Sequence, residues 1–257
     1  MSTPPRILTI AGSDCSGGAG IQADIKTVTM LGGFAMTAIT AVTAQNTLGV
    51  QAVEVLSPDM VAAQIDSCIG DIGLDAVKIG MLGSAEIAAV VADRLAGLDV
   101  PIVFDPVMVA TSGAALADAA TMAAFARLIA IATLVTPNLP ELAALGGEAL
   151  LAQSAQAVLV KGGHGQGDVL IDRLVTSAGE QARWEGARID TRHTHGTGCT
   201  LATAIATGLG QGLSLEEAIA QARQFVRAAL SATPGLGGGH GPLGLSLIHI
   251  SEPTRPY

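Results

Sequence analysis

Short apolar runs alternate with helical patterns along most of this 257-residue chain, and this alternation limits its fold more than any other feature. The runs are RILTIAG, MTAITAVTA, QAVEVL, DAVKIG, PIVFDP, TLVTPN and AVLVKGG. The helical patterns between them cover residues 19–31, 58–70, 85–95 and 118–132. Strands that are apolar on both faces and separated by helices form parallel sheets covered on both sides. The sequence therefore predicts an α/β fold with a mostly parallel central sheet flanked by helices on both faces.

The pattern changes after residue 161. The runs DVLIDRLV and QARWEGARI alternate apolar and polar residues, as a hairpin does, and helices are expected over 198–210 and 215–230. We therefore expect antiparallel strands at one edge of the sheet. Ligands of such folds bind at the carboxyl ends of the strands, where the glycine-rich turns of this chain fall.

Charge and cysteine content narrow the classes of partner. The 13 Lys and Arg are outnumbered by 22 Asp and Glu, giving a net charge of -9, and neither half has a basic block. This balance argues against nucleic acid or a membrane as partner. Three well-separated cysteines indicate a reduced compartment, and the N-terminus lacks the long apolar region of a secretory signal, so a cytoplasmic location is expected.

The last thirteen residues differ from the rest. LSLIHISEPTRPY, residues 245–257, follows a glycine-rich stretch without periodicity or a helix cap, and it resembles the translation of a sequencing adapter. We expect one domain over residues 1–244 and a non-native tail over 245–257.

The first glycine turn, AGSDCSGGAGIQAD at residues 11–24, formally contains the dinucleotide pattern G-x-G-x-x-A. In a true fingerprint the first glycine follows the strand directly, and an acidic residue lies about twenty residues further on. Both conditions fail here, and the chain has no G-x-x-x-x-G-K-[ST]. An ordinary tight turn explains the pattern better, and a nicotinamide-dependent oxidoreductase is disfavoured.

The second turn, HTHGTGCT at residues 193–200, leads directly into the apolar run LATAIATGL. Backbone N–H groups from Gly196 to Cys199 would converge at a helix N-terminus, which favours an anion. An ordinary N-cap is the alternative. Cys199 favours the anion site, because a thiol in the first turn of a helix is biased toward the thiolate. We therefore expect the pKa of Cys199 to be lowered.

Several motifs occur together in one order: AGSDCSGGAGIQAD, AVTAQNTLGV, KIGML, DPVMVATSG, TPNLPE, VLVKGGH and HTHGTGCT. From about residue 6 to 244 the chain resembles the hydroxymethylpyrimidine/phosphomethylpyrimidine kinases of thiamine biosynthesis, in the ribokinase-like superfamily. The resemblance implies transfer of the γ-phosphoryl group of ATP to the hydroxymethyl group of a 4-aminopyrimidine, and then to its monophosphate. The implied ligands are the pyrimidine, ATP and Mg²⁺, and a homodimer is expected.

The resemblance also assigns roles at the two glycine turns. It implies that the catalytic anion site is formed by Gly196, Thr197, Gly198 and Cys199, with Cys199 where sugar kinases of the superfamily have a catalytic Asp. The first turn would border the substrate pocket through Gly12. Asp24 would hydrogen-bond to the substrate alcohol, unless it is simply a carboxylate on a helix surface.

Gln45 is the expected reader of the pyrimidine, because a carboxamide offers a donor and an acceptor in one plane. Alternatively, it is a polar residue at a strand end that is satisfied by backbone groups. Met81 and Val107 would form apolar walls against the ring, although each alone is equally consistent with a core residue.

The remaining motifs are implied to hold the nucleotide. In TPNLPE, Asn138 would contact ATP and Glu141 would hold hydrated Mg²⁺ together with Asp105, since Mg²⁺ needs few protein carboxylates. Lys161 and His164 of VKGGH would face the phosphates of ATP. Asp105 could instead be a turn residue, and Lys161 could extend along the surface to solvent.

Two other functions stay open. A pyridoxal kinase on the same scaffold is expected to have a second cysteine after DPVMV, but Ala110 follows Val109 here. A non-catalytic pyrimidine sensor is the other possibility, although the anion site and the metal motif look intact.

The segment between Glu141 and Ala157 is also shorter than the family usually has, by about one helix.

Overall fold

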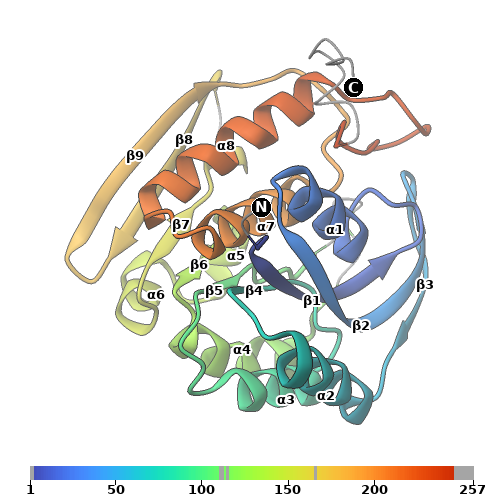
Figure 1. Ribbon diagram of the computed structural model, residues 1–257. Coiled ribbons are helices and arrows are strands. Elements are labelled where there is room, and N and C mark those ends of the chain that lie inside the picture. The colour runs from blue at the N-terminus through green and yellow to red at the C-terminus, as the bar shows by residue number, and fades with distance from the viewer. Residues whose placement is uncertain (1–2, 110–112, 114–115, 165–166, 246–257) are drawn as a thin grey trace.

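Residues 3–109, 113, 116–164 and 167–245 are described by the computed structural model (Figure 1). Within them, nine strands form one sheet in the order β3-β2-β1-β4-β5-β6-β7-β8-β9. The strands are β1 (Arg6–Asp14), β2 (Phe34–Asn46), β3 (Gly49–Val55), β4 (Ala76–Ile79), β5 (Ile102–Phe104), β6 (Leu134–Val135), β7 (Val158–Val160), β8 (Val169–Thr176) and β9 (Gly179–Ala187). The predicted alternation of strands and helices is confirmed.

The strands from β2 through β1, β4, β5 and β6 to β7 pair in parallel, and β8 and β9 add an antiparallel hairpin beyond β7. This is the edge at which antiparallel strands were predicted. The opposite edge is antiparallel as well, because β3 pairs with β2 in that sense. Only Thr47 and Leu48 separate these two strands, and so short a connection cannot make a parallel crossover.

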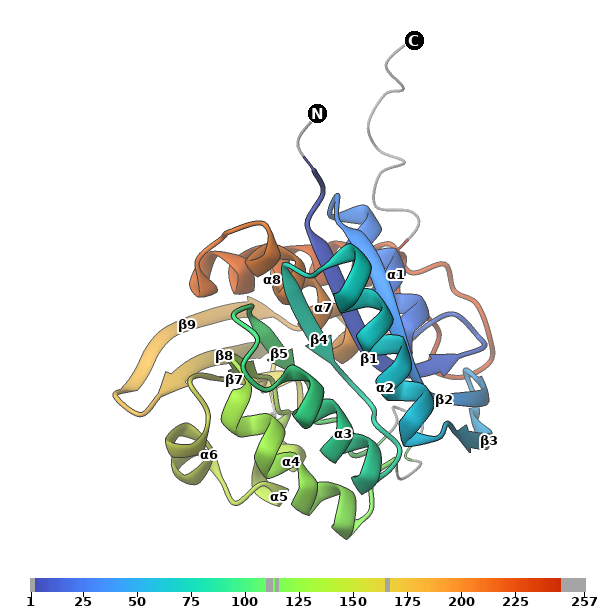
Figure 2. The same ribbon diagram turned by 60° about the horizontal axis from the view of Figure 1, so that its bottom comes forward.

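Helices cover both faces of the sheet (Figures 1 and 2). One face carries α2 (Pro58–Ser67), α3 (Ala85–Leu95), α4 (Ala119–Ile131) and α6 (Glu148–Ser154), and the other carries α1 (Gly20–Met30), α7 (Thr197–Gly210) and α8 (Leu215–Ser231). Neighbouring strand residues alternate between the two cores: Leu8 packs in the first and Ile7 in the second. The parallel strands are apolar on both faces because both faces are buried.

Two short helices were not predicted. Helix α5 (Leu139–Ala144) and helix α6 lie in the segment that the sequence indicated to be short. Helix α5 begins with a capping box, in which the side chains of Asn138 and Glu141 each accept the other's backbone N–H. Pro140 follows in its first turn, a position that proline favours. The signal for a helix start was therefore present in TPNLPE. A single π-helical turn (Cys68–Ile72) and a 3₁₀ turn (Gly162–His164) complete the elements.

Lys78 of β4 is completely buried and forms an ion pair with Asp24 of α1. Its Nζ donates to both carboxylate oxygens, at 3.0 and 2.8 Å, and Thr203 Oγ1 of α7 donates to the same carboxylate at 2.6 Å. Burial alone would lower the pKa of Lys78, but the attraction of Asp24 outweighs it and raises the pKa. The pair thus ties two helices to the middle of the sheet.

Among the described helices, none is long and apolar enough to cross a membrane.

Lys78→Met should lower the free energy of unfolding by about 3–5 kcal/mol, because it leaves the Asp24 carboxylate buried without a cation. The double variant Lys78→Met/Asp24→Leu should lose clearly less, since neither charge then remains. Urea denaturation measures both. Arg94→Ala, which breaks an exposed pair with Asp66, is the control and should cost no more than about 1 kcal/mol. Equal losses in the single and double variants would contradict the argument.

The C-terminal boundary falls within a packed segment. Leu245, which the sequence analysis assigned to the tail, is 3% exposed and packs in the second core together with Leu243. Residues 246–257 lie outside the described part of the chain. We propose that these residues are the dispensable, non-native part.

A chain ending at Leu245 should therefore unfold at the same denaturant concentration as the full chain and keep its activity. A chain ending at Gly244 should lose roughly 2–5 kcal/mol of unfolding free energy, the usual effect of removing most of a buried leucine. Denaturant titration of the two truncations distinguishes them. If the chain ending at Leu245 were less stable than the full chain, residues 246–257 would contribute to the fold.

Candidate active site

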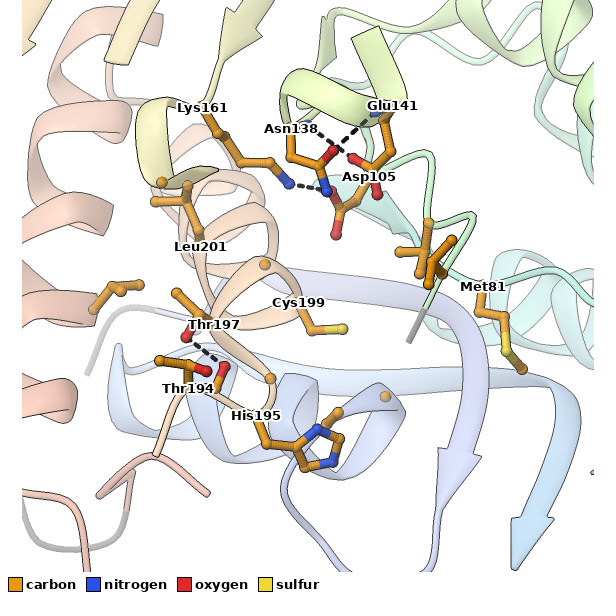
Figure 3. Close-up of a pocket in the computed structure, with 18 of the residues that line it drawn as sticks. Met81, Asp105, Asn138, Glu141, Lys161, Thr194, His195, Thr197, Cys199 and Leu201 are labelled. Atoms are coloured by element: carbon orange, nitrogen blue, oxygen red, sulfur yellow. Dashed lines mark hydrogen bonds and ion pairs between the residues drawn. The ribbon is translucent and has the colours of Figure 1, made fainter. Parts of the chain in front are cut away.

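A cavity of about 880 Å³ lies at the carboxyl ends of the parallel strands. Nearly every predicted site residue lines it: Gly12, Gln45, Met81, Asp105, Val107, Asn138, Glu141, Lys161, Gly196, Thr197, Gly198 and Cys199. In Figure 3, Asp105, Asn138, Glu141 and Lys161 gather on one side, His195 lies on the other, and Cys199 lies between them. The topology thus brings together motifs that are far apart in the sequence.

Asp24 was predicted to meet the substrate alcohol, and this prediction is wrong. The side chain is fully buried, does not line the cavity and is held by Lys78 and Thr203. The reason is that α1 turns this position toward the sheet, where the buried ammonium group needs a counterion.

Two other predictions concern positions where no side chain is described. His164 has its backbone in the 3₁₀ turn, but its side chain lies outside the described part, although the neighbouring Gly163 lines the cavity. Ala110, which bears on the pyridoxal kinase alternative, also lies outside the described residues.

The second glycine turn opens directly into α7. Gly196 is the N-cap residue with a φ of 84° and makes no side-chain cap, and the N–H of Thr197 donates to the carbonyl oxygen of Thr194 at 3.2 Å. A Cβ on Gly196 would lie 1.9 Å from the carbonyl oxygen of Gly18, so the two glycine turns touch and only glycine fits. No residue with a side chain fits at this N-cap position. No cap side chain can therefore accept hydrogen bonds from the backbone N–H groups at the start of α7. This arrangement suits an anion at the end of the helix dipole.

A cation lies beside this turn. A Cβ on Gly198 would lie 3.4 Å from Asp105 Oδ2 and 3.6 Å from Lys161 Nζ, so both charged groups border the backbone of the turn. Lys161 Nζ donates to Asp105 Oδ1 at 2.8 Å, and Thr136 Oγ1 donates to the same oxygen at 2.9 Å. Burial would lower the pKa of Lys161, but Asp105 and Glu141 outweigh it and raise the pKa. Lys161 therefore stays charged, and it is paired rather than extended to solvent.

The pKa of Cys199 is raised, which corrects the prediction of a lowered pKa. Burial is the main cause, because it disfavours the charged thiolate, and the carboxylates Asp24 and Asp105 add to it. The ammonium group of Lys78 and the backbone N–H of Gly20 act in the opposite direction but do not compensate. The helix N-terminus alone therefore does not decide the protonation of this thiol.

Asn138 and Glu141 hold each other at the start of α5. Asn138 Oδ1 accepts the N–H of Glu141 at 2.9 Å, and Glu141 Oε2 accepts the N–H of Asn138 at 2.8 Å. Burial raises the pKa of Glu141, although Lys161 opposes this. Within the residues described, no group of three or more His, Cys, Asp or Glu side chains could enclose a metal ion. The buried carboxylates Asp105 and Glu141 suit a cation that keeps most of its water.

The other end of the cavity is lined by Gln45 and by the apolar side chains of Met81 and Val107. A Cβ on Gly12 would lie 2.3 Å from Met81 Cε, so the glycine leaves room for the methionine to form a wall. Cys15 Sγ contacts the backbone of Gln45, whereas the Gln45 side chain meets His195 rather than the backbone. The alternative that backbone groups satisfy this side chain does not hold.

Sequence reasoning missed Asp14 and His195, which also line the cavity. Asp14 is 3% exposed and lies 2.8 Å from His195 Nε2 through its Oδ2 atom. Its carboxylate also accepts the N–H groups of Ser16, Gly18 and Ala19. An Asp that precedes a glycine turn commonly accepts such N–H groups, and this signal was available. Nothing in the sequence indicated its histidine partner.

The fold of this chain is similar to those of kinases of known structure. The fold is similar to that of Bacillus subtilis pyridoxal kinase in an ADP complex, with a TM-score of 0.87 and 32% identity over 97% of this chain and all of that one. It is also similar to a phosphomethylpyrimidine kinase from Clostridium difficile, with a TM-score of 0.75 and 36% identity over 88% of this chain and 99% of that one.

Sequence similarity is higher to one curated relative. The hydroxymethylpyrimidine/phosphomethylpyrimidine kinase of Streptomyces coelicolor is 48% identical over 94% of each chain. The family model described as phosphomethylpyrimidine kinase matches residues 14–244, which include both glycine turns and the carboxylate motif. The chain belongs to the phosphomethylpyrimidine kinase family.

Proposed function

We infer that this chain transfers the γ-phosphoryl group of ATP to 4-amino-5-hydroxymethyl-2-methylpyrimidine, and then a second phosphoryl group to the resulting monophosphate. The inference is carried by the start of α7 in this family member, a helix N-terminus whose N-cap glycine has no side chain. Lys161 lies beside it, and Gln45 lines the same cavity. One end of the cavity suits a phosphate and the other a flat polar ring.

Phosphoryl transfer requires mainly positioning and charge stabilisation. In our proposal the backbone N–H groups of the Gly196–Cys199 turn hold the transferred phosphoryl group, and Lys161 and Asn138 bind the phosphates of ATP. His164 is assigned to the nucleotide by its motif alone. Cys199 lies in the first turn of α7 and lines the cavity, and we propose it as the acceptor of the proton of the substrate alcohol.

We further propose that Asp105 and Glu141 hold Mg²⁺ through water. Bound there, the ion would neutralise charge on the phosphates. The two buried carboxylates fit this role, because Mg²⁺ keeps several waters and seldom needs more protein ligands. The expected requirement for Mg²⁺ is tested by adding a chelator to the assay.

Gln45, Met81 and Val107 are the proposed contacts of the pyrimidine, with Gly12 giving space for Met81. The carboxamide of Gln45 would face the polar edge of the ring, and the apolar side chains would face its planes.

We also propose a homodimer in the cytoplasm, which light scattering of the purified protein and fractionation of cells would test.

Pyridoxal is the alternative acceptor, and the similarity to a pyridoxal kinase structure favours keeping it. A non-catalytic sensor is the other alternative, and it would bind the pyrimidine without consuming ATP.

With Mg²⁺ and ATP, we expect turnover of the aminopyrimidine alcohol and of its monophosphate, and a lower kcat/KM with pyridoxal. The reason is that Gln45 matches a ring nitrogen beside an exocyclic amine, and pyridoxal has no such pair. A coupled ADP-release assay with the three acceptors side by side measures this. A higher kcat/KM with pyridoxal would overturn the substrate assignment, and binding without turnover would favour the sensor.

The pH profile should report the ionisation of Cys199. Only the thiolate can accept the alcohol proton, and the pKa of this thiol is raised, so its active fraction is small at neutral pH and grows as the pH increases. We therefore expect kcat to rise from about pH 7 and to be still rising at about pH 9, because the raised pKa of Cys199 lies above the ordinary thiol value.

Cys199→Ala should lower kcat by about 10²- to 10⁴-fold at the upper end of this range and flatten the profile. Cys199→Asp should restore part of the rate at neutral pH, because a carboxylate ionises more readily than a thiol. If Cys199→Ala kept a near-normal kcat and the same profile, the backbone N–H groups would carry the step and Cys199 would only pack.

A further inference from the structure

His195 contacts two side chains through a single ring nitrogen. Its Nε2 atom lies 2.8 Å from Asp14 Oδ2 and 3.1 Å from Gln45 Nε2. A ring nitrogen either carries a proton and donates, or has a lone pair and accepts. It cannot donate to Asp14 and accept from the amide nitrogen of Gln45 at the same time.

Asp14 decides which of the two roles Nε2 takes. Burial opposes ionisation of this carboxyl, but hydrogen bonds from His195 and Ser16 outweigh burial and lower its pKa. The carboxylate also receives N–H groups from Gly18 and Ala19, at 3.2 and 2.9 Å. Every contact therefore treats Asp14 as an acceptor. His195 Nε2 must then carry the proton, both when the ring is neutral and when it is charged.

This proton fixes the amide of Gln45. The NH₂ group of the amide would repel a protonated Nε2, whereas the amide oxygen can accept from it. Half a turn about the last bond of the side chain exchanges these two atoms without moving any other group. The favourable arrangement thus has Gln45 Oε1 toward His195, which leaves the NH₂ group available to a ligand in the cavity.

We propose that Asp14 and His195 are positioning residues that hold the Gln45 amide with its NH₂ group toward the ligand, so that the site selects a ring with a nitrogen acceptor at this point. The identity of the ligand in this inference rests on the proposed function, whereas the protonation of His195 does not. The ring nitrogen beside the exocyclic amine of the aminopyrimidine is such an acceptor, and the amine can donate to the second lone pair of Gln45 Oε1.

Asp14 and His195 also connect the proposed ring contacts of Gln45 to the second glycine turn. His195 immediately precedes Gly196, and Asp14 holds the first glycine turn through Gly18 and Ala19. A Cβ on Gly18 would lie 2.6 Å from His195 Cδ2, so the imidazole packs directly on that turn. A ring bound by Gln45 is therefore placed relative to the start of α7 by one continuous set of contacts.

The first test needs neither ligand nor turnover. In protein with ¹⁵N-labelled histidine rings, NMR should find the proton of His195 on Nε2, with or without a second proton on Nδ1. The spectrum of His195→Gln assigns the signal by its loss. A neutral ring protonated only on Nδ1 would overturn the proposal, whatever the protein phosphorylates.

The second test is kinetic. His195→Leu should raise KM for the aminopyrimidine by about 10-fold, on the order of one hydrogen bond, with KM for ATP changed by less than about 2-fold. His195→Gln, which keeps an N–H donor, should recover part of this loss. Gln45→Leu sets the upper limit at roughly 5- to 150-fold. Equal increases in both KM values, or no increase, would overturn the proposal.

A modified ligand distinguishes an effect of His195 on the orientation of the Gln45 amide from a general effect on the packing of the pocket. In a pyridine analogue, C–H replaces the ring nitrogen next to the amine and a methyl group replaces the amine, so the analogue makes neither hydrogen bond with Gln45 and the orientation of the amide no longer matters to it. His195→Leu should change the affinity for this analogue by no more than about 2-fold, measured by calorimetry against the parent compound. An equal loss for both compounds would show that His195 only supports the pocket and would overturn the proposal.

Discussion

The buried ion pair between Lys78 and Asp24 is the constraint on which the rest of the site depends. Lys78 lies in the middle of the sheet with no exposed surface, and a lone ammonium group there would be very costly. Asp24 compensates it from α1, and Thr203 joins the carboxylate from α7. Helices α1 and α7, whose N-termini border the cavity, are therefore both held against β4 by the ammonium group of Lys78. The same interaction removes Asp24 from the cavity, so the requirement for a counterion outweighs a role in binding.

The lysine side chains near the proposed anion site are paired with carboxylates in the structure. Lys161 is matched by Asp105 and Lys78 by Asp24, and these carboxylates contribute to the raised pKa of Cys199. Because the cations beside it are already paired, the proposed anion site would rely mainly on backbone N–H groups. Such groups are fixed in place by the helix and need no reorganisation when charge develops on a phosphoryl group. A thiol in these surroundings remains protonated until the pH rises or a ligand changes the local charge.

The order of strands and helices could be predicted because each parallel strand is apolar throughout and each long helix is periodic. Helices α5 and α6 were missed because each is shorter than two full turns of clear pattern, although Asn138 and Glu141 carried the capping signal. Most of the site residues that the motifs predicted do line the cavity. The motifs could not predict the fate of Asp24, since its partner Lys78 is 54 positions away in a run that reads only as a strand. The protonation of Cys199 likewise depends on burial, which a motif does not report.

The two glycine turns, which are separated by most of the chain, function as one structure. The carbonyl of Gly18 occupies the space of a side chain at Gly196, and Asp14 of the first turn binds His195 of the second. A motif search treats each turn alone, and neither turn by itself indicates what the cavity recognises. Taken together, they place the Asp14 carboxylate, the Nε2 atom of His195 and the Gln45 carboxamide in contact one after another. Each group restricts the next, because a hydrogen bond needs one donor and one acceptor. Selection of a ring in this cavity thus begins at a residue that need not touch the ring.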